Sequence, residues 1–400
     1  MKYKKALLFF IPIINILVDI LFVFPSLRVV LSSFRGGVYL FILFYFTVYY
    51  RNRLWNINRY SFLLLLYFTI LLFFSSELSL SFNRYLKFFS GIMMFPIYFI
   101  LTKERDDLIL ISKAYFIVGL LFVFNFVISR IFSLGRTVYD EDSASFDSGN
   151  FSATVLYIGS VVMILTPVLM YFSNYVKRNL ILLLSIAIGA LLLISMRRTA
   201  IIIVAVGLLI LFYYYVKKNG ILQRIVQVGL LIALLYPFVE GKVMERLQAR
   251  SDRFEEGALE KEGRYVETII ISENIFSFKE IYYSLFGKEL FNSAGNYSYP
   301  DPKRVIHADY NILLSGSGLI GIALYLMMFI SIYKLFRFEK SHLKNTGFNF
   351  LIWVIGYSLF FMLVAAGFSS GLLSVTYRAA IFSIMGSFLG YLSNTKQLNK

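Results

Sequence analysis

His307 is one of two histidines in this chain of 400 residues, and it lies where the polar stretch RVIHADYN is followed by a long apolar run. An imidazole has an unperturbed pKa of about 6.5, so it can accept a proton from a hydroxyl nucleophile near neutral pH. Asp309 is placed to cap the helix that the apolar run predicts. The alternative for His307 is a solvated or structural side chain, which is the role we assign to His342 in a basic loop.

Arg197 and Arg198 form the second chemical feature, in the segment SMRRTA between two apolar runs. On insertion scales a charge inside a membrane costs about 2.5 to 3.5 kcal/mol, and less at the interface, so two adjacent arginines need a reason to lie there. Guanidinium groups match phosphate oxygens bidentately, which indicates an anion site. The alternatives are snorkelling to the interface and pairing with loop carboxylates.

The elements that must position these residues are predicted by composition. The chain is 58% hydrophobic and 16% charged. Its apolar residues recur in blocks of about 17 to 25, the length that crosses a bilayer as a helix. We therefore predict an all-α polytopic membrane protein. The net charge of +16 does not indicate nucleic acid, because Lys and Arg fall mostly in short loops between the blocks. With no Cys and two His, we expect neither disulfides nor a metal site.

We expect about twelve spans in a single integral membrane domain, residues 1–400, with a large extracytoplasmic loop at 240–308 between the ninth and tenth. An even number places both termini on one side, and the positive-inside rule makes that side the cytoplasm. The first block has no small-residue cleavage site and predicts a membrane helix. The expected spans cover residues 6–24, 37–50, 60–76, 85–101, 109–128, 152–172, 179–196, 199–216, 221–239, 309–333, 348–366 and 372–392.

Four further patterns have ordinary explanations. GSGLIG at Gly316–Gly321 fits a dinucleotide fingerprint, but no strand precedes it, so we expect close helix packing through small residues. GFSSG, which contains Ser369, has nucleophile-elbow spacing but lies in a short turn. The acidic residues Asp140–Asp142 suit either a metal or a plain acidic loop, and we favour the loop. Asp19 is expected to pair with Arg28 or Arg35, or else to touch substrate.

Two long segments carry a family resemblance. EGRYVETIIISENIFSFKEIYYSLFGKEL, followed by HADYNILLSGSGLIGIALY, resembles the O-antigen polymerase and O-antigen ligase superfamily. The shared features are an Arg near the start of the loop, a Phe-Gly pair further on, and then His, Asn, Leu and Gly-Leu-Ile-Gly at the next helix. SMRRTA is similar to the Ser-Arg-Thr turn of that superfamily.

The resemblance implies a C-type membrane glycosyltransferase that needs no metal or cofactor and uses an undecaprenyl diphosphate-linked glycan as donor. Arg264 matches the loop arginine, and Arg197 or Arg198 matches the turn arginine, both expected to bind the diphosphate. His307 matches the histidine that activates the acceptor hydroxyl. Asp309 and Asn311 are further candidate substrate contacts, although HADYN places Asn311 further from the histidine than in many relatives.

The function expected from this resemblance is polymerisation of lipid-linked repeat units into O-antigen or capsular polysaccharide at the outer face of the cytoplasmic membrane. The expected partners are the lipid bilayer, a chain-length regulator and a flippase. One alternative is a ligase that transfers the glycan to a lipid A core with the same residues. Another is a transporter of polysaccharide or lipid-linked sugar, which would need charged or broken helices near the membrane midplane.

Overall fold

The apolar blocks of the sequence form α-helices. The computed structural model describes residues 4–132, 149–152, 154–195, 197–215, 263–298, 305–343 and 347–398. These residues are 83% helical and contain no strand. The helices in chain order are α1 (Lys4–Leu21), α2 (Arg28–Ile57), α3 (Arg59–Leu72), α4 (Leu78–Leu101), α5 (Arg105–Ile131), α6 (Tyr157–Tyr171), α7 (Arg178–Ile194), α8 (Arg198–Tyr215), α10 (Gly263–Phe276), α11 (Ile281–Phe286), α12 (Asp309–Ser341), α13 (Gly347–Gly367) and α14 (Val375–Leu398).

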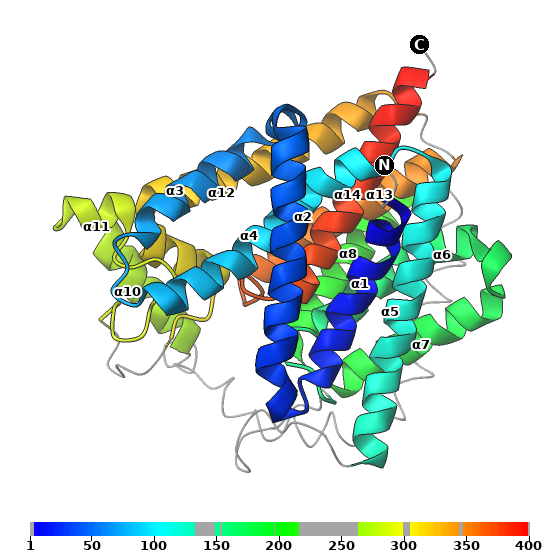
Figure 1. The fold of residues 1–400 in the computed structure, drawn as a ribbon, viewed down its shortest axis with the longest axis horizontal. Helices are drawn as coiled ribbons and strands as arrows, with labels where there is room; N and C mark the ends of the chain where they lie inside the picture. Colours follow the sequence, from blue (N-terminus) through cyan, green and yellow to red (C-terminus); the bar gives the residue numbers. More distant parts are fainter. Residues whose placement is uncertain are drawn as a thin grey trace.

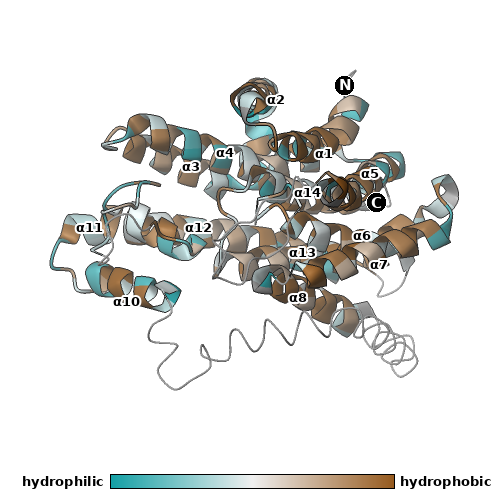
Figure 2. Cartoon of the chain, turned by 90° about the horizontal axis from the view of Figure 1, so that it is seen from below, coloured by the Kyte–Doolittle hydropathy of each residue, from teal (hydrophilic) through white to brown (hydrophobic). Residues whose placement is uncertain are grey.

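Six of these helices, α2, α4, α5, α12, α13 and α14, are long and apolar enough to cross a membrane. The helices α3, α6, α7 and α8 are apolar but shorter. Hydrophobic residues dominate α6, α7 and α13, whereas α11 and the ends of α10 are more hydrophilic (Figure 2). The structure thus agrees with a polytopic membrane protein. Eleven of the expected spans coincide with helices, and the twelfth, at 221–239, lies outside the described residues. The total of twelve remains a prediction.

The helix ends gather on two sides of the bundle (Figure 1). At one side Lys4 Nζ lies 2.6 Å from Asp107 Oδ2, and Asn394 donates to the Lys103 carbonyl at 3.1 Å. At the other side the α3–α4 turn contacts the segment 287–298 through Glu289, and the loop 368–374 contacts the start of α8 and the start of α12. We refer to this second side as the loop end. Because every described connection joins ends of the same side, consecutive long helices run in alternate directions.

α14 is the most deeply buried of the candidate spans. Gly386 and Gly390 face α4, and a Cβ atom at these positions would come within 2.2 Å of the Phe95 carbonyl oxygen and 2.3 Å of the Phe99 carbonyl oxygen. Small residues spaced by four allow the backbones of two membrane helices to approach this closely. The packing fixes the axial position of α14, whose first turn carries Arg378, a residue of the site described below.

α12 is broken at Gly318, where φ is +62° and ψ is −164°. The segment that follows α11 enters this break. Gly287 turns there with φ +78°, and a Cβ atom on it would lie 2.4 Å from the backbone of Gly316 and Ser317. The amide of Lys288 donates to the Ser315 carbonyl at 2.8 Å, and Tyr67 Oη donates to the Ser317 carbonyl at 2.8 Å. Small residues in GSGLIG therefore admit a loop backbone, so the expectation of helix packing is only partly confirmed.

Glu289 anchors the same loop to the α3–α4 turn. Its carboxylate accepts hydrogen bonds from Ser75, Ser76 and Asn292. Partial burial would raise the pKa of Glu289, but these bonds and one from the amide of Glu77 outweigh burial and hold the pKa below its usual value. The folded arrangement thus favours the ionised carboxylate, and its hydrogen bonds hold the segment 287–298 against the α3–α4 turn.

Substituting Gly318 by alanine is expected to lower the stability of the protein by at least about 2 kcal/mol, because strained positive-φ backbone and overpacking both contribute. A Cβ atom there would lie 2.4 Å from the Leu285 carbonyl. The control is Gly37→Ala, since Gly37 has no neighbouring atom within 4 Å. Thermal unfolding of the two purified variants in detergent measures the difference. Equal midpoints would show that the α12 break tolerates a side chain.

Candidate active site

His307 and Glu267 form a pair at the loop end. His307 Nδ1 lies 3.2 Å from Glu267 Oε1, and the His307 amide donates to Glu267 Oε2 at 3.2 Å. The Glu267 side chain is fully buried in α10, whereas 43% of the His307 side chain is exposed. A buried carboxylate next to Nδ1 favours the tautomer in which Nδ1 carries the proton. The second ring nitrogen, Nε2, is then a free base.

This arrangement has the geometry of a general base. The Glu267 carboxylate fixes the orientation of the ring and would stabilise the imidazolium that forms when Nε2 takes a proton. The same carboxylate also holds the backbone just before α12, because it accepts from the His307 amide. The Glu267 side chain therefore positions both the imidazole ring of His307 and the backbone that precedes α12.

Asn311 and Arg264 lie next to this pair. Asn311 Nδ2 donates to Thr268 Oγ1 at 2.9 Å, and the Asn311 side chain is buried. Asn311 thus joins the first turn of α12 to α10. Arg264 precedes Glu267 and Thr268 by three and four residues on α10, so the three lie on one face of the helix. Arg264 is half-buried, and its guanidinium has no hydrogen-bond or ion-pair partner within the described ranges.

Asp309 is buried and fully used by the protein. Its Oδ1 accepts from the Gly371 amide at 3.0 Å, and its Oδ2 lies 3.2 Å from Arg378 Nη2. Arg378 also donates to the Gly371 carbonyl at 3.1 Å and to Tyr325 Oη at 3.0 Å. The expected helix cap is wrong, because Ala308 is the N-cap residue of α12 and Asp309 is its first residue. Asp309 instead ties α12 to the loop 368–374 and to α14.

Arg197 lies in the turn between α7 and α8, as expected. Its guanidinium carbon is 5.9 Å from the centre of the Tyr157 ring. Tyr157 Oη contacts Ser370 Oγ at 3.4 Å. Thr199 Oγ1 contacts Ser369 Oγ at 2.7 Å, so Ser369 is a packed turn serine.

These contacts attach the arginine turn to the loop 368–374, which also binds Asp309 through Gly371. The loop 368–374 therefore contacts both the start of α12, which follows His307, and the turn that carries Arg197. Arg198 is the first residue of α8, and its side chain lies outside the described part of the structure.

The other sequence patterns have clear outcomes where the structure describes them. Asp19 pairs with Arg35 at 2.7 Å, whereas Arg28 donates to the Phe22 carbonyl. No group of three or more His, Asp or Glu that could hold a metal occurs among the residues described. Asp140–Asp142 lie outside them.

Sequence reasoning missed two residues of this site, Glu267 and Arg378. Glu267 is separated from His307 by 40 residues, and nothing in its local sequence distinguishes it from a loop carboxylate. Arg378 did have a signal, since an arginine inside a membrane span is costly and usually has a partner.

Comparison with known proteins adds nothing to this assignment. No protein-family model matches the chain, and no curated protein matches it significantly.

Proposed function

We propose that the protein is a membrane glycosyltransferase that polymerises undecaprenyl diphosphate-linked oligosaccharide units into O-antigen or capsular polysaccharide. The observation that carries this proposal is the His307–Glu267 pair, a half-exposed base held by a fully buried acid. The neighbouring Arg264 supplies a cation without a partner in the described region. A base and a cation at the loop end of a bundle of apolar helices suit a substrate with a hydroxyl, a diphosphate and a lipid.

The reaction follows from these groups. Nε2 of His307 accepts the proton of the acceptor sugar hydroxyl while its oxygen attacks the anomeric carbon of the donor. The bond between that carbon and the diphosphate oxygen breaks, and the lipid diphosphate leaves with the bonding electrons. Arg264 and the arginines of the 197–198 turn stabilise the charge of the leaving group. The proton on His307 passes to solvent before the next cycle.

The proposal includes an orientation. The loop end faces the outside of the cytoplasmic membrane, and both termini face the cytoplasm. The opposite end supports this choice, since it carries an excess of Lys and Arg in and near the helix ends, among them Arg51, Arg53, Arg59, Lys103 and Lys177.

A transporter is the second candidate, because the break of α12 at Gly318 is a feature of many transporter sites. In this protein the break is filled by protein. The Ser315 and Ser317 carbonyls accept from Lys288 and Tyr67, so they do not face an open cavity. A ligase shares the proposed residues and differs only in its acceptor.

The experiment that tests the function is a gel ladder of surface glycan with the lipid-linked pool extracted in parallel. Cells that lack the protein are expected to show a single repeat, and complementation is expected to restore long chains. Long lipid-linked polymer that accumulates in the deletion strain would indicate a ligase. An unchanged ladder would refute both transferases and favour transport.

Arg264→Lys is expected to shorten the ladder and to lower the rate by about tenfold, since lysine keeps the charge but loses the bidentate fork. Initial rates of polymer formation in membrane vesicles measure this effect. Lys279→Arg, the reverse exchange in the exposed turn after α10, is the control and should leave the rate unchanged. Full activity of Arg264→Lys would argue against bidentate binding of the diphosphate.

A further inference from the structure

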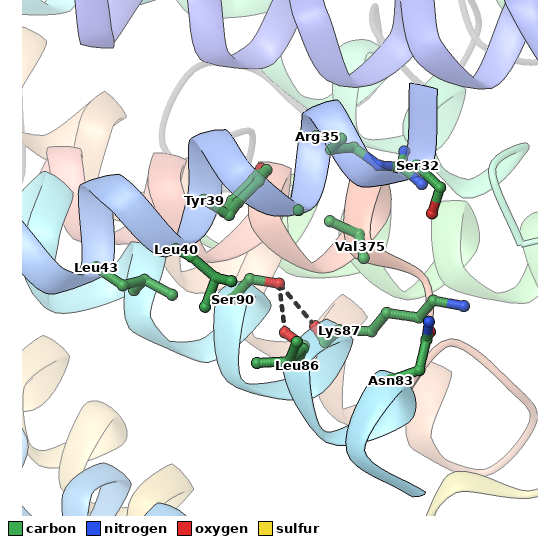
Figure 3. A pocket seen from close by; sticks show the side chains of 11 residues that line it. Ser32, Arg35, Tyr39, Leu40, Leu43, Asn83, Leu86, Lys87, Ser90 and Val375 are labelled. Atoms are coloured by element: carbon green, nitrogen blue, oxygen red, sulfur yellow. Dashed lines mark hydrogen bonds between the residues drawn. The ribbon is translucent and has the colours of Figure 1, made fainter. Parts of the chain in front are cut away.

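A second polar site lies between α2 and α4, near their ends at the loop side. A pocket of about 90 Å³ opens there, and Figure 3 shows the side chains that line it. Its residues come from α2, α4 and the first residue of α14. It shares no lining residue with the His307 site. The lining consists of Ser32, Arg35, Gly36, Tyr39, Leu40, Leu43, Asn83, Leu86, Lys87, Ser90 and Val375.

One end of this pocket is cationic. Arg35 and Ser32 on α2 lie opposite Lys87 and Asn83 on α4 (Figure 3). Arg35 is paired with Asp19 at 2.7 Å, and it also contacts Thr376 Oγ1 at 3.3 Å. The ammonium group of Lys87 has no hydrogen-bond or ion-pair partner in the described parts of the chain. Asp19 balances the charge of only one of the two basic side chains, Arg35 and Lys87. The remaining positive charge is one that an anion would neutralise.

The other end of the pocket is apolar and faces the lipid. Tyr39, Leu40 and Leu43 follow Arg35 along α2, and Leu86 lies across from them on α4. Leu40 is 44% exposed, and its neighbours Phe41 and Phe44 are more than 70% exposed. Large apolar side chains with this exposure in a helix long enough to cross a membrane contact hydrocarbon. The lining of the pocket therefore changes along α2 from cationic at Arg35 to apolar at Leu40 and Leu43.

Gly36 lines this pocket and leaves space in it. A Cβ atom on Gly36 would have no neighbour within 4 Å, although the residue lines the pocket. Gly37 also has no neighbour within 4 Å, but it does not line the pocket. The two adjacent glycines therefore provide a matched pair in which the same substitution fills the pocket at one position only.

We propose that this pocket binds the phosphate headgroup of a phosphorylated membrane lipid. The phosphate lies between Lys87, Arg35 and the amide of Asn83, and the hydrocarbon chain runs along Leu40 and Leu43. Cationic donors that are partly withdrawn from water bind phosphate oxygens through charge-assisted hydrogen bonds. The proposal does not depend on the glycosyltransferase function. Two lipids carry this chemistry, a polyprenyl phosphate and an anionic glycerophospholipid, and the experiment separates them.

The test is native mass spectrometry of the full chain in detergent, titrated separately with undecaprenyl phosphate, phosphatidylglycerol and undecaprenol. Lys87→Gln and Gly36→Leu are each expected to weaken the binding of a phosphorylated lipid by about tenfold or more. Gly37→Leu should stay within about twofold of the wild type. Undecaprenol lacks the phosphate, so Lys87→Gln should leave its weak binding unchanged. Thermal midpoints of the three variants show whether each is folded.

The lipid series identifies the source of the phosphate. If Lys87→Gln and Gly36→Leu weaken the binding of undecaprenyl phosphate alone, the pocket is assigned to a polyprenyl carrier. If they weaken the binding of phosphatidylglycerol equally, the pocket is assigned to anionic lipid of the bilayer. Binding of both phosphorylated lipids by Lys87→Gln and Gly36→Leu within about twofold of the wild type would overturn the proposal. Equal weakening of undecaprenol by Lys87→Gln would also overturn it, because the site would then not recognise phosphate.

Discussion

For the proposed polymerase, substituting His307 by glutamine is expected to leave a folded, membrane-inserted protein whose rate of polymer formation is lower by about 10² to 10⁴-fold, the usual effect of losing a general base. A glutamine amide can still donate to Glu267, so the buried carboxylate keeps a partner. The amide cannot accept a proton at neutral pH, so the nucleophile is no longer activated. Initial rates in membrane vesicles supplied with lipid-linked repeat units measure the loss.

The second histidine is the control for this experiment. His342 lies at the C-terminal end of α12, on the side opposite the loop end, where its Nδ1 is 2.9 Å from the Phe338 carbonyl. His342→Gln should therefore retain the wild-type rate. Added imidazole should restore part of the activity of His307→Ala, because 43% of the His307 side chain is exposed and imidazole from solution can take the place of the missing base. Normal polymer from His307→Gln at native expression would remove this residue from the mechanism.

Glu267→Gln separates positioning from chemistry at the same site. The variant keeps a hydrogen-bonding side chain next to the ring but loses the negative charge that stabilises the imidazolium. We expect kcat to fall and KM for the lipid-linked donor to remain the same, because the Glu267 carboxylate contacts the proposed base, His307. A rise in KM with unchanged kcat would assign Glu267 to donor binding instead.

The helical plan could be predicted from the sequence because it depends on a local property. A run of apolar residues long enough to cross a bilayer forms a helix whatever its neighbours are, since its backbone must satisfy its own hydrogen bonds. For the same reason the ends of α7 and α8 around Arg197 lie where the sequence placed them. The break at Gly318 could not be predicted, because it depends on Gly287, which is distant in sequence and enters the same space.

The contacts of the candidate site could not be predicted from the sequence, although its residues were singled out there. His307 was chosen because histidine is rare in this chain and because it lies where a polar stretch meets an apolar run. Its contact with Glu267 depends on how α10 packs against the start of α12, and no local pattern encodes that packing. Asp309 illustrates the same limit, since its position suggested a helix cap, yet its carboxylate binds Arg378 from a helix near the end of the chain.

The Arg378–Asp309 pair gives the largest expected effect on stability. Both side chains are 1% exposed. Arg378→Met would leave the Asp309 carboxylate buried without its cation, and breaking a buried ion pair in this way typically costs about 3 to 5 kcal/mol. The thermal unfolding midpoint of the purified variant in detergent should fall accordingly. Retention of the wild-type midpoint would show that Asp309 is satisfied without Arg378.

The double variant Arg378→Met with Asp309→Leu distinguishes charge pairing from packing. Replacing both partners by apolar side chains of similar volume is often neutral, so the double variant should recover most of the stability that Arg378→Met loses. Asp309 lies two residues from His307 and binds the Gly371 amide, so the double variant also loses one link between α12 and the loop 368–374. Recovered stability with low polymerase activity would mean that this link positions the base. Recovery of both stability and activity would mean that the Arg378–Asp309 pair acts in folding alone. Recovery of neither would mean that the polar network itself is required for the packing of α12 against α14.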